Sequence, residues 1–278
     1  MTGQRASRSL SRTGRTSNTF QLAGGTGRTI RVIYRCAVPQ QQPEQQAPPV
    51  QRLRVRYAKR GRLRFTSHRD FSRAFERAVF RARVPMAYSS GFNPHPRISY
   101  AGAAPTGSAS EAEYLELALA EVVVPADVHA MLDEALPPGL DVIEVVESPG
   151  GSLADLLEAS RWRIEIDADR ESVMDAVERF LAADEAPVER MTKKGMREFD
   201  ARGAVVALVV LPGDEAGSRT ALEVVLRHGT PAVRPDDVLR GLETVAGLGA
   251  GEAPLMTRLA QGPLLGGDEV GDPLAPRA

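Results

Sequence analysis

Residues 52–82, RLRVRYAKRGRLRFTSHRDFSRAFERAVFRA, define the first structural elements of the chain. Leu53, Val55 and Tyr57 alternate with arginines, which is the period-two pattern of a half-buried strand. The basic triplet at 59–61 predicts a tight turn, and the alternation over 62–65 predicts a second strand. We therefore expect a hairpin whose solvent face is made of arginine.

A helix is expected directly after this hairpin. Ser67 is a candidate N-cap, with Asp70 three residues later, and Pro85 ends the helical pattern. Apolar residues at helical spacing define its buried face: Phe71, Ala74, Phe75, Ala78 and Ala82. Arginines that repeat every four residues predict a basic ridge along the same helix: Arg69, Arg73, Arg77 and Arg81.

Further periodic segments predict two α+β units. In the first unit, a strand, a helix and a strand are expected at 114–120, 126–135 and 140–147. In the second unit, strands are expected at 161–166, near 188, at 204–211 and at 221–227, and helices at 170–182 and 236–246. Two tandem ferredoxin-like α/β sandwiches suit this order, and one continuous α+β domain is the alternative.

The predicted domains have tails on both sides. Residues 1–50 are rich in Ser, Thr, Arg, Gly, Gln and Pro, so we expect a disordered tail there. The basic domain then covers 51–150 and the second ferredoxin-like domain 158–247. Residues 248–278 are rich in Gly and Pro and are expected to form a flexible C-terminal tail.

Composition excludes several classes of protein. No apolar run reaches about 18 residues, so no transmembrane helix is expected. The N-terminus lacks the continuous apolar core of a secretory signal, and we expect a cytoplasmic protein. The sequence has one cysteine, which excludes an internal disulfide and a cysteine-based iron–sulfur site, and no metal site is expected.

Charge divides the chain into two opposite parts. Residues 1–107 contain 20 Lys and Arg against 3 Asp and Glu, whereas residues 108–278 contain 15 against 33. A basic half of this kind suggests a polyanionic partner, with RNA as our leading candidate. The alternative is that the two halves neutralise each other within the fold.

The loop at 88–97, YSSGFNPHPR, is the first candidate site. Gly91 permits a positive φ, and prolines on both sides of His95 fix its backbone. A rigidly held imidazole beside Arg97 suits proton transfer or anion binding, so we select His95 as a catalytic candidate and Asn93 and Arg97 as binding candidates. The alternative is a loop whose histidine only bonds to backbone.

The start of the helix is the second candidate site. Free N–H groups at a helix N-terminus favour an anion, and His68 and Arg69 lie in that first turn. With the neighbouring basic residues, this predicts a phosphate-binding surface formed by Arg64, Ser67, His68, Arg69, Arg73 and Arg77. The alternative is an ordinary N-cap with an exposed histidine.

Two further groups complete the candidates. Glu111 and Glu113 lie on one face of a strand; they either balance arginines, which we favour, or assist acid–base chemistry, with Glu113 as the catalytic candidate. Lys193 and Lys194 form a basic island at an expected hairpin tip in the acidic half, where they could contact a phosphate backbone or simply be solvated.

Three segments carry a resemblance to a known family: YAKRGRLRFTSHRDF, AYSSGFNPHPRISYAGAAPTG and SEAEYLEL at 57–71, 87–107 and 110–117. They resemble the radical-SAM-linked protein family, a bacterial domain of unknown function, and the likeness continues more weakly through KKGMREFDAR. In that family the domain is often fused to, or encoded beside, a radical SAM protein, near genes for a ribonuclease and ribosomal proteins. This chain has no Cys-x3-Cys-x2-Cys, so the resemblance implies that S-adenosylmethionine and the iron–sulfur cluster belong to a separate partner.

The leading hypothesis is an accessory or substrate-binding protein that works with a separate radical SAM enzyme on RNA. A stand-alone RNA-modifying or small-molecule transferase that uses His95 and the Glu111/Glu113 pair is the first alternative. A ribosome-assembly factor is the second. The sequence does not decide between an enzyme and a binding protein.

Overall fold

The computed structural model describes residues 8–10, 16–18, 45–192, 195–213 and 219–275. The chain divides into two units, 1–44 and 45–278. In the first unit, β1 (Arg8–Leu10) pairs antiparallel with β2 (Thr16–Asn18), a pairing that the expectation of a disordered tail did not include. Most of the predicted tail lies outside the described residues.

The first half of the second unit has a ferredoxin-like order of elements. It contains strands β3 (Gln51–Lys59), β4 (Ile98–Ala101), β5 (Ala109–Leu119) and β6 (Val142–Glu147), with helices α1 (His68–Arg81) and α2 (Pro125–Ala135). The strands lie in the order β4-β5-β3-β6 and all neighbours are antiparallel. This is a β-α-β-β-α-β unit with its first strand paired between the third and fourth.

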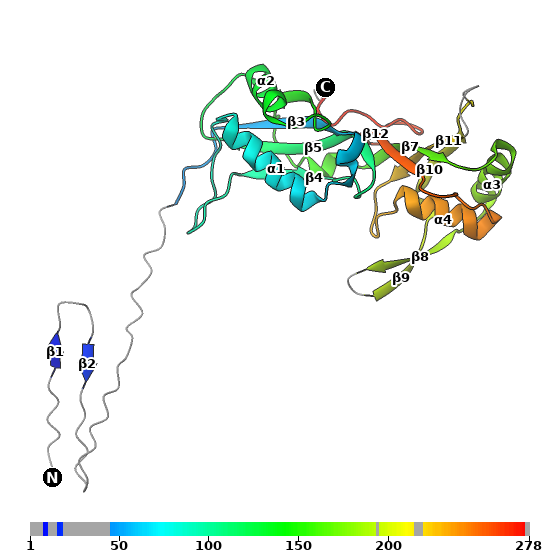
Figure 1. Cartoon of the computed structure of the whole chain (residues 1–278), viewed down its shortest axis with the longest axis horizontal. Coiled ribbons are helices and arrows are strands. Elements are labelled where there is room, and N and C mark those ends of the chain that lie inside the picture. The colour runs from blue at the N-terminus through cyan, green and yellow to red at the C-terminus, as the bar shows by residue number, and fades with distance from the viewer. Residues whose placement is uncertain (1–7, 11–15, 19–44, 193–194, 214–218, 276–278) are drawn as a thin grey trace, which may run out of the picture. The chain divides into compact units, whose positions relative to one another are not determined.

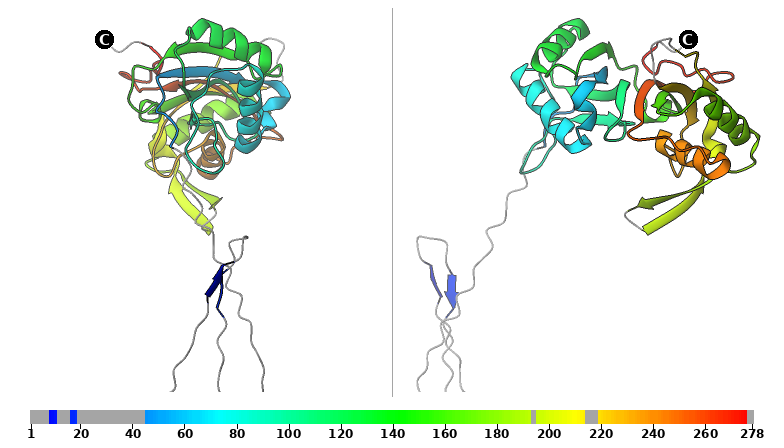
Figure 2. Two further views of the ribbon diagram at one scale, coloured as in Figure 1. Left: turned by 90° about the vertical axis from the view of Figure 1, so that its left-hand side faces the viewer. Right: turned by 45° about the vertical axis from the view of Figure 1, so that its right-hand side comes forward.

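The second half repeats this plan (Figure 1). It contains β7 (Ala159–Ile166), α3 (Arg170–Ala182), β10 (Val205–Val210), β11 (Thr220–Arg227), α4 (Pro235–Ala246) and β12 (Leu255–Gly262). The order across the sheet is β10-β11-β7-β12, which matches the first half strand for strand. A hairpin of β8 (Pro187–Thr192) and β9 (Gly195–Asp200) is inserted after α3 and projects from this half (Figure 2).

Strand β12 joins the halves into one eight-stranded sheet. It pairs antiparallel with β7 over its whole length, and parallel with β5 at Thr257↔Ala109 and Arg258↔Ser110. The α+β class is confirmed, with two ferredoxin-like units in a continuous sheet. The prediction of a flexible tail at 248–278 is wrong for residues 255–262, which form the closing strand of the second unit. Glycines and prolines on both sides of this strand gave the segment the composition of a loop.

The predicted hairpin over 52–65 is also wrong. Strand β3 runs to Lys59, and the next residues form a short 3-10 helix, η1 (Gly61–Phe65), which pairs with no strand. The partners of β3 are β5 and β6. The arginines of β3 do not form a uniform solvent face: Arg54 is 2% exposed and donates to the carbonyl oxygen of Gly150 at 2.7 Å, whereas the side chain of Arg52 is 49% exposed.

The helix after η1 forms as the sequence predicts. Ser67 is the N-cap of α1, and its side chain accepts from the backbone N–H of Asp70. Phe71, Phe75 and Ala78 are buried against β3 and β5, and Tyr57 stacks on Phe71 at 4.6 Å between ring centroids. Burial of each such aromatic side chain stabilises the fold by about 2 kcal/mol. One face of α1 is therefore fixed in the core, and the opposite face is presented outward.

Candidate functional site

The outward face of α1 carries the predicted basic ridge. Its members are exposed: Arg69, Arg73, Arg77 and Arg81, which we call the α1 arginine face. In the described part of the chain, no ion pair involves any of these four side chains. Their positive charge is therefore available to an anionic partner.

A groove runs between this face and the 88–97 loop. It has a volume of about 680 Å³ and is lined by Arg73, Glu76, Arg77, Phe80, Arg81, Tyr88 and Pro96. Phe80 is 79% exposed although it is a large apolar side chain. Guanidinium groups with exposed aromatic rings form the kind of surface on which phosphates and unstacked bases bind. We call this feature the α1 groove.

Two hydrogen bonds between Ser89 and His95 close the loop beside the groove. The N–H of His95 donates to Oγ of Ser89 at 3.0 Å, and the N–H of Ser89 donates to the carbonyl oxygen of His95 at 2.9 Å. Gly91 has φ +136, as its predicted role requires. His95 and Asn93 are exposed, so the loop presents both side chains to solvent.

The predicted phosphate site at the start of α1 is occupied by the helix's own residues. The hydroxyl of Ser67 donates to the Asp70 carboxylate at 2.7 Å, so a negative charge already lies at this helix end. His68 is exposed and its ring packs edge-on against Tyr100 at 5.1 Å. Among the described residues, His68 and His95 have no hydrogen bond or ring contact with each other. No direct contact therefore joins these two histidines of the first and second candidate sites.

The other predicted binding residues are dispersed. Arg64 lies in η1, where its guanidinium packs over the ring of Phe65 at 4.7 Å and its buried Nε has no partner in the described part of the chain. Arg97 takes part in backbone pairing, since its N–H donates to the carbonyl oxygen of Ala87 at 2.8 Å. Lys193 and Lys194, which the sequence placed at an expected hairpin tip, lie outside the described residues.

Both candidate carboxylates are held by arginines, which confirms the favoured ion-pair interpretation. Glu111 accepts from Nε of Arg60 at 2.7 Å in a partly exposed pair. Glu113 is 2% exposed and pairs with Arg258 of β12, which is 3% exposed. This buried pair lies at the junction between the halves, and sequence reasoning missed Arg258 because its segment was expected to be a tail.

The side chains of Tyr57 and Lys59 lie near this ion pair, since the charges of Glu113 and Arg258 act on both. The Nζ of Lys59 donates to the carbonyl oxygens of Ala104 and Pro105 at 3.4 and 3.3 Å, and burial lowers the pKa of Lys59. Burial, followed by the negative charge of Glu113, raises the pKa of Tyr57 well above its usual value. We call Tyr57, Lys59, Glu113 and Arg258 the joint cluster.

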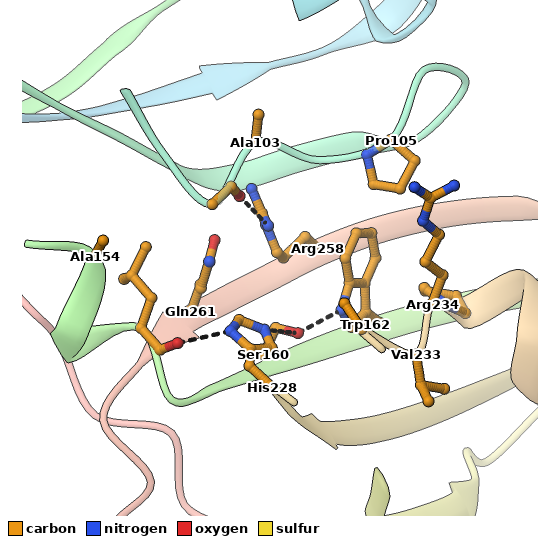
Figure 3. A pocket seen from close by; sticks show the side chains of 14 residues that line it. Ala103, Pro105, Ala154, Ser160, Trp162, His228, Val233, Arg234, Arg258 and Gln261 are labelled. Carbon is orange, nitrogen blue, oxygen red and sulfur yellow. Dashed lines mark hydrogen bonds between the residues drawn. The ribbon is translucent and has the colours of Figure 1, made fainter. Parts of the chain in front are cut away.

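A second cavity, the joint pocket, opens beside this cluster (Figure 3). It has a volume of about 370 Å³ and takes its walls from both halves of the sheet. Residues of the 102–105 segment come from the first half, and residues of β7 and β12, His228 after β11 and the 232–235 segment come from the second. The polar side chains that line it are Ser160, His228, Arg234, Arg258 and Gln261.

A hydrogen-bond chain fixes one wall of the joint pocket. The indole Nε1 of Trp162 donates to Oγ of Ser160 at 2.8 Å, and that Oγ lies 2.9 Å from Nε2 of His228. The Nδ1 of His228 lies 2.7 Å from the carbonyl oxygen of Leu157, and when it carries the proton, Nε2 accepts from the serine hydroxyl. Burial lowers the pKa of His228, which favours this neutral form.

Sequence reasoning selected none of these five pocket residues. Ser160, His228 and Gln261 come from separate strands and loops and show no local motif. The one available signal was Trp162, the sole tryptophan of the chain, between two arginines at the start of a predicted strand.

Residues 52–235 match the family model described as uncharacterized protein conserved in bacteria, DUF2344. The chain belongs to the DUF2344 family. No curated protein is similar to it.

A solved structure also shows similarity to this DUF2344 chain. It is titled "Crystal Structure of a Cbf5-Nop10-Gar1 Complex", with a TM-score of 0.41 and 11% sequence identity. The alignment covers 80% of this chain and 56% of the other, so this chain spans little more than half of that protein's length.

The DUF2344 match includes the α1 arginine face, the 88–97 loop and Glu113, and it ends before β12. In the described ranges, no helix has the length and apolar content to cross a membrane. The same ranges hold no group of three or more His, Cys, Asp or Glu side chains that could bind a metal ion.

Proposed function

We propose that this DUF2344 protein binds RNA on its α1 arginine face and serves as an accessory, substrate-binding protein for a separate radical SAM enzyme. The observation that carries the RNA part is the set of four exposed arginines without ion pairs, beside a groove with exposed aromatic side chains. Phosphate contacts by such arginines supply most of the affinity for a nucleic acid, independent of its sequence.

The ion pairs show that the basic and acidic parts of the chain, residues 1–107 and 108–278, neutralise each other only in part. Arginines of the acidic half pair within that half, as in Arg161–Glu223 at 2.7 Å and Arg179–Asp175 at 2.9 Å. Arg52 and Arg54 of the basic part pair with Glu116 of the acidic part, and Arg60 pairs with Glu111 and Asp141. Pairing between the two parts thus neutralises arginines of β3 and of the turn after it, whereas no ion pair of the described residues involves the α1 arginine face, which keeps its charge.

The α1 groove favours single-stranded over double-stranded RNA. Phe80 and Tyr88 line it, and Phe92 in the adjoining loop is 63% exposed. Unstacked bases pack on exposed aromatic rings, which each stabilise binding by about 1–3 kcal/mol, whereas bases inside a helix are not accessible to them. A loop or an unpaired end of an RNA is therefore the expected ligand.

The radical SAM part of the proposal rests on the resemblance of three segments to the radical-SAM-linked family. One cysteine in 278 residues cannot supply the three cysteines of a radical SAM cluster motif, so S-adenosylmethionine and the cluster would be bound by the partner. A stand-alone transferase that uses Glu111 and Glu113 is less well supported, because arginines hold both carboxylates.

The RNA proposal predicts the effect of reversing charge on α1. The double variant Arg73→Glu/Arg77→Glu should weaken binding of single-stranded RNA of every sequence. It should also reduce the slope of log affinity against log salt by about 1.4, since each neutralised phosphate contributes about 0.7 on single strands. Fluorescence anisotropy with a labelled oligonucleotide at several salt concentrations measures both quantities.

The matched control is Arg179→Glu/Arg240→Glu, which changes net charge equally on exposed arginines of α3 and α4 that already have acidic partners. This control should keep the slope of the unaltered protein. Equal losses in both variants would mean that binding follows net charge, and the proposed surface would be wrong. No binding of RNA at low salt would overturn the RNA proposal itself.

The partner proposal predicts a stable association. The protein, expressed with a radical SAM enzyme encoded beside it, should co-purify as a complex, and the iron–sulfur chromophore should remain with the partner after the two are separated. Size-exclusion chromatography with absorbance detection measures this. Separate elution at micromolar concentrations of both proteins, with and without RNA, would contradict the accessory role.

A further inference from the structure

We propose that the joint pocket is a binding site for one nucleotide, with its base inside the pocket and its phosphate at the rim. The nucleotide could be a free mononucleotide or one residue of a bound RNA. Only the RNA source depends on the proposed function, since the pocket does not overlap the α1 groove.

The strongest indication of a ligand is an unsatisfied acceptor. Gln261 is 1% exposed, lines the pocket, and its Oε1 has no hydrogen-bond partner in the described part of the chain. A buried polar atom without a partner destabilises a fold, so such atoms in native proteins call for an explanation. The N–H or amino group of a nucleobase would supply the missing donor.

The position of Gln261 is enforced by the opposite wall. Gly102 has φ +57, and a Cβ at that position would lie 2.0 Å from Nε2 of Gln261. The carbonyl oxygen of Gly102 also accepts from Arg258 at 2.7 Å. The backbone at Gly102, in the first half, therefore packs directly against the Gln261 side chain of β12. This contact holds the Gln261 amide beside the cavity.

The remaining walls suit a flat ring with a negative group at one end. Leu157, Pro105 and Ala103 provide apolar surface, and Trp162 stands between Arg258 and Arg234 in Figure 3. Arg234 is exposed and has no acidic partner among the ion pairs of the described residues. Among the described residues that line the pocket there is no carboxylate. A volume of about 370 Å³ is at the lower end of the range for small-molecule sites, which fits one nucleotide.

A route for RNA to this pocket exists beside η1. A neighbouring hollow is lined on one side by Arg64, Phe65 and residues 106–108 and on the other by Asp236 and residues 253–256, and Pro105 lines the joint pocket. Phe65 is 59% exposed. A strand of RNA held by basic and aromatic side chains of η1 would thus pass the rim of the pocket, where one nucleotide could enter.

The chain provides its own reporter for this site, because Trp162 is its sole tryptophan and lines the pocket. Each of the four ribonucleoside 5′-monophosphates is titrated into the full-length protein, with excitation at wavelengths beyond nucleobase absorption. At least one should change the emission saturably, whereas inorganic phosphate alone should not. A parallel titration uses single-stranded RNA oligonucleotides, so that a response to RNA without a response to mononucleotides identifies RNA as the source.

Two variants test the geometry. Gln261→Leu removes the acceptor at nearly constant size, and should weaken the base-dependent response roughly tenfold while leaving the melting temperature equal or higher, since an unsatisfied buried group is lost. Arg234→Gln should weaken binding of the mononucleotide but not of the corresponding nucleoside. Arg240→Gln, on the same helix outside the pocket, is the matched control and should change neither.

The outcomes separate this inference from the proposed function. Unchanged emission with every mononucleotide and every RNA, or unchanged affinity in Gln261→Leu, would overturn the pocket assignment. RNA binding that depends on Arg73 and Arg77 would then still stand. Saturable binding of a mononucleotide without any RNA binding would support the pocket and overturn the RNA proposal.

Discussion

A chain that ends at Gly247 should fail to fold into a stable protein. This truncation removes β12, which pairs with β7 over residues 255–262 and joins β7 to β5. It also removes Arg258 and so leaves the buried Glu113 without its partner. Removing β12 exposes strand edges, and removing Arg258 leaves a buried charge unpaired. We expect their combined free-energy cost to exceed the stability of an ordinary domain, which is about 5–15 kcal/mol. We expect aggregation on expression or no cooperative thermal transition by circular dichroism.

The single substitution Thr257→Pro tests the same strand without shortening the chain. Proline lacks the N–H that a central strand donates, and residue 257 pairs with both neighbouring strands. A chain that ends at Ala275 keeps all of β12 and is the control, which should melt like the full chain. A truncation at Gly247 with a normal melting transition would show that β12 is dispensable, and the described sheet would be wrong.

The second large effect is expected from breaking the ion pair between Glu113 and Arg258. Glu113→Ala should lower the free energy of unfolding by about 3–5 kcal/mol, because it leaves a buried guanidinium without a counter-ion. Arg258→Ala should cost at least as much, since Arg258 also donates to Gly102 and Ser110 and packs over Trp162 at 5.4 Å. Chemical denaturation monitored by circular dichroism measures both values.

The pair Arg60–Glu111 is the matched control for this prediction. Its side chains are 48% and 29% exposed, so Glu111→Ala should cost no more than about 1 kcal/mol. The double variant Glu113→Gln/Arg258→Met should be more stable than either alanine variant, because no unpaired charge remains in the interior. A cost of Glu113→Ala similar to that of Glu111→Ala would mean that the pair is not buried in solution.

Local patterns in the sequence were sufficient for the helices. The bounds of α3 at 170–182 were predicted to the residue, and Ser67 was identified as the cap of α1, because caps and helical spacing involve neighbours in the chain. Strands depended on partners far away. Arg62–Phe65 alternates like a strand but meets no neighbour, while β12 lies among glycines and prolines and meets two.

The candidate sites also divide into one that depends on neighbours in the sequence and one that depends on residues far apart in it. The α1 arginine face was predictable, since a spacing of four residues places side chains on one side of a helix. The joint pocket was not, because Ser160, His228 and Gln261 become neighbours only when three strands pair. The role of Glu113 was uncertain in the sequence for the same reason: its partner is 145 residues away.

The contact between β5 and β12 has a mechanical consequence. Only two residue pairs connect these strands, Thr257↔Ala109 and Arg258↔Ser110, whereas β3 and β5 are paired over most of their length. A sheet bends most easily where the fewest backbone hydrogen bonds cross from strand to strand. We therefore expect any bending between the two halves to be concentrated on this line, and because the joint pocket takes its walls from both halves, such bending would change the width of its mouth.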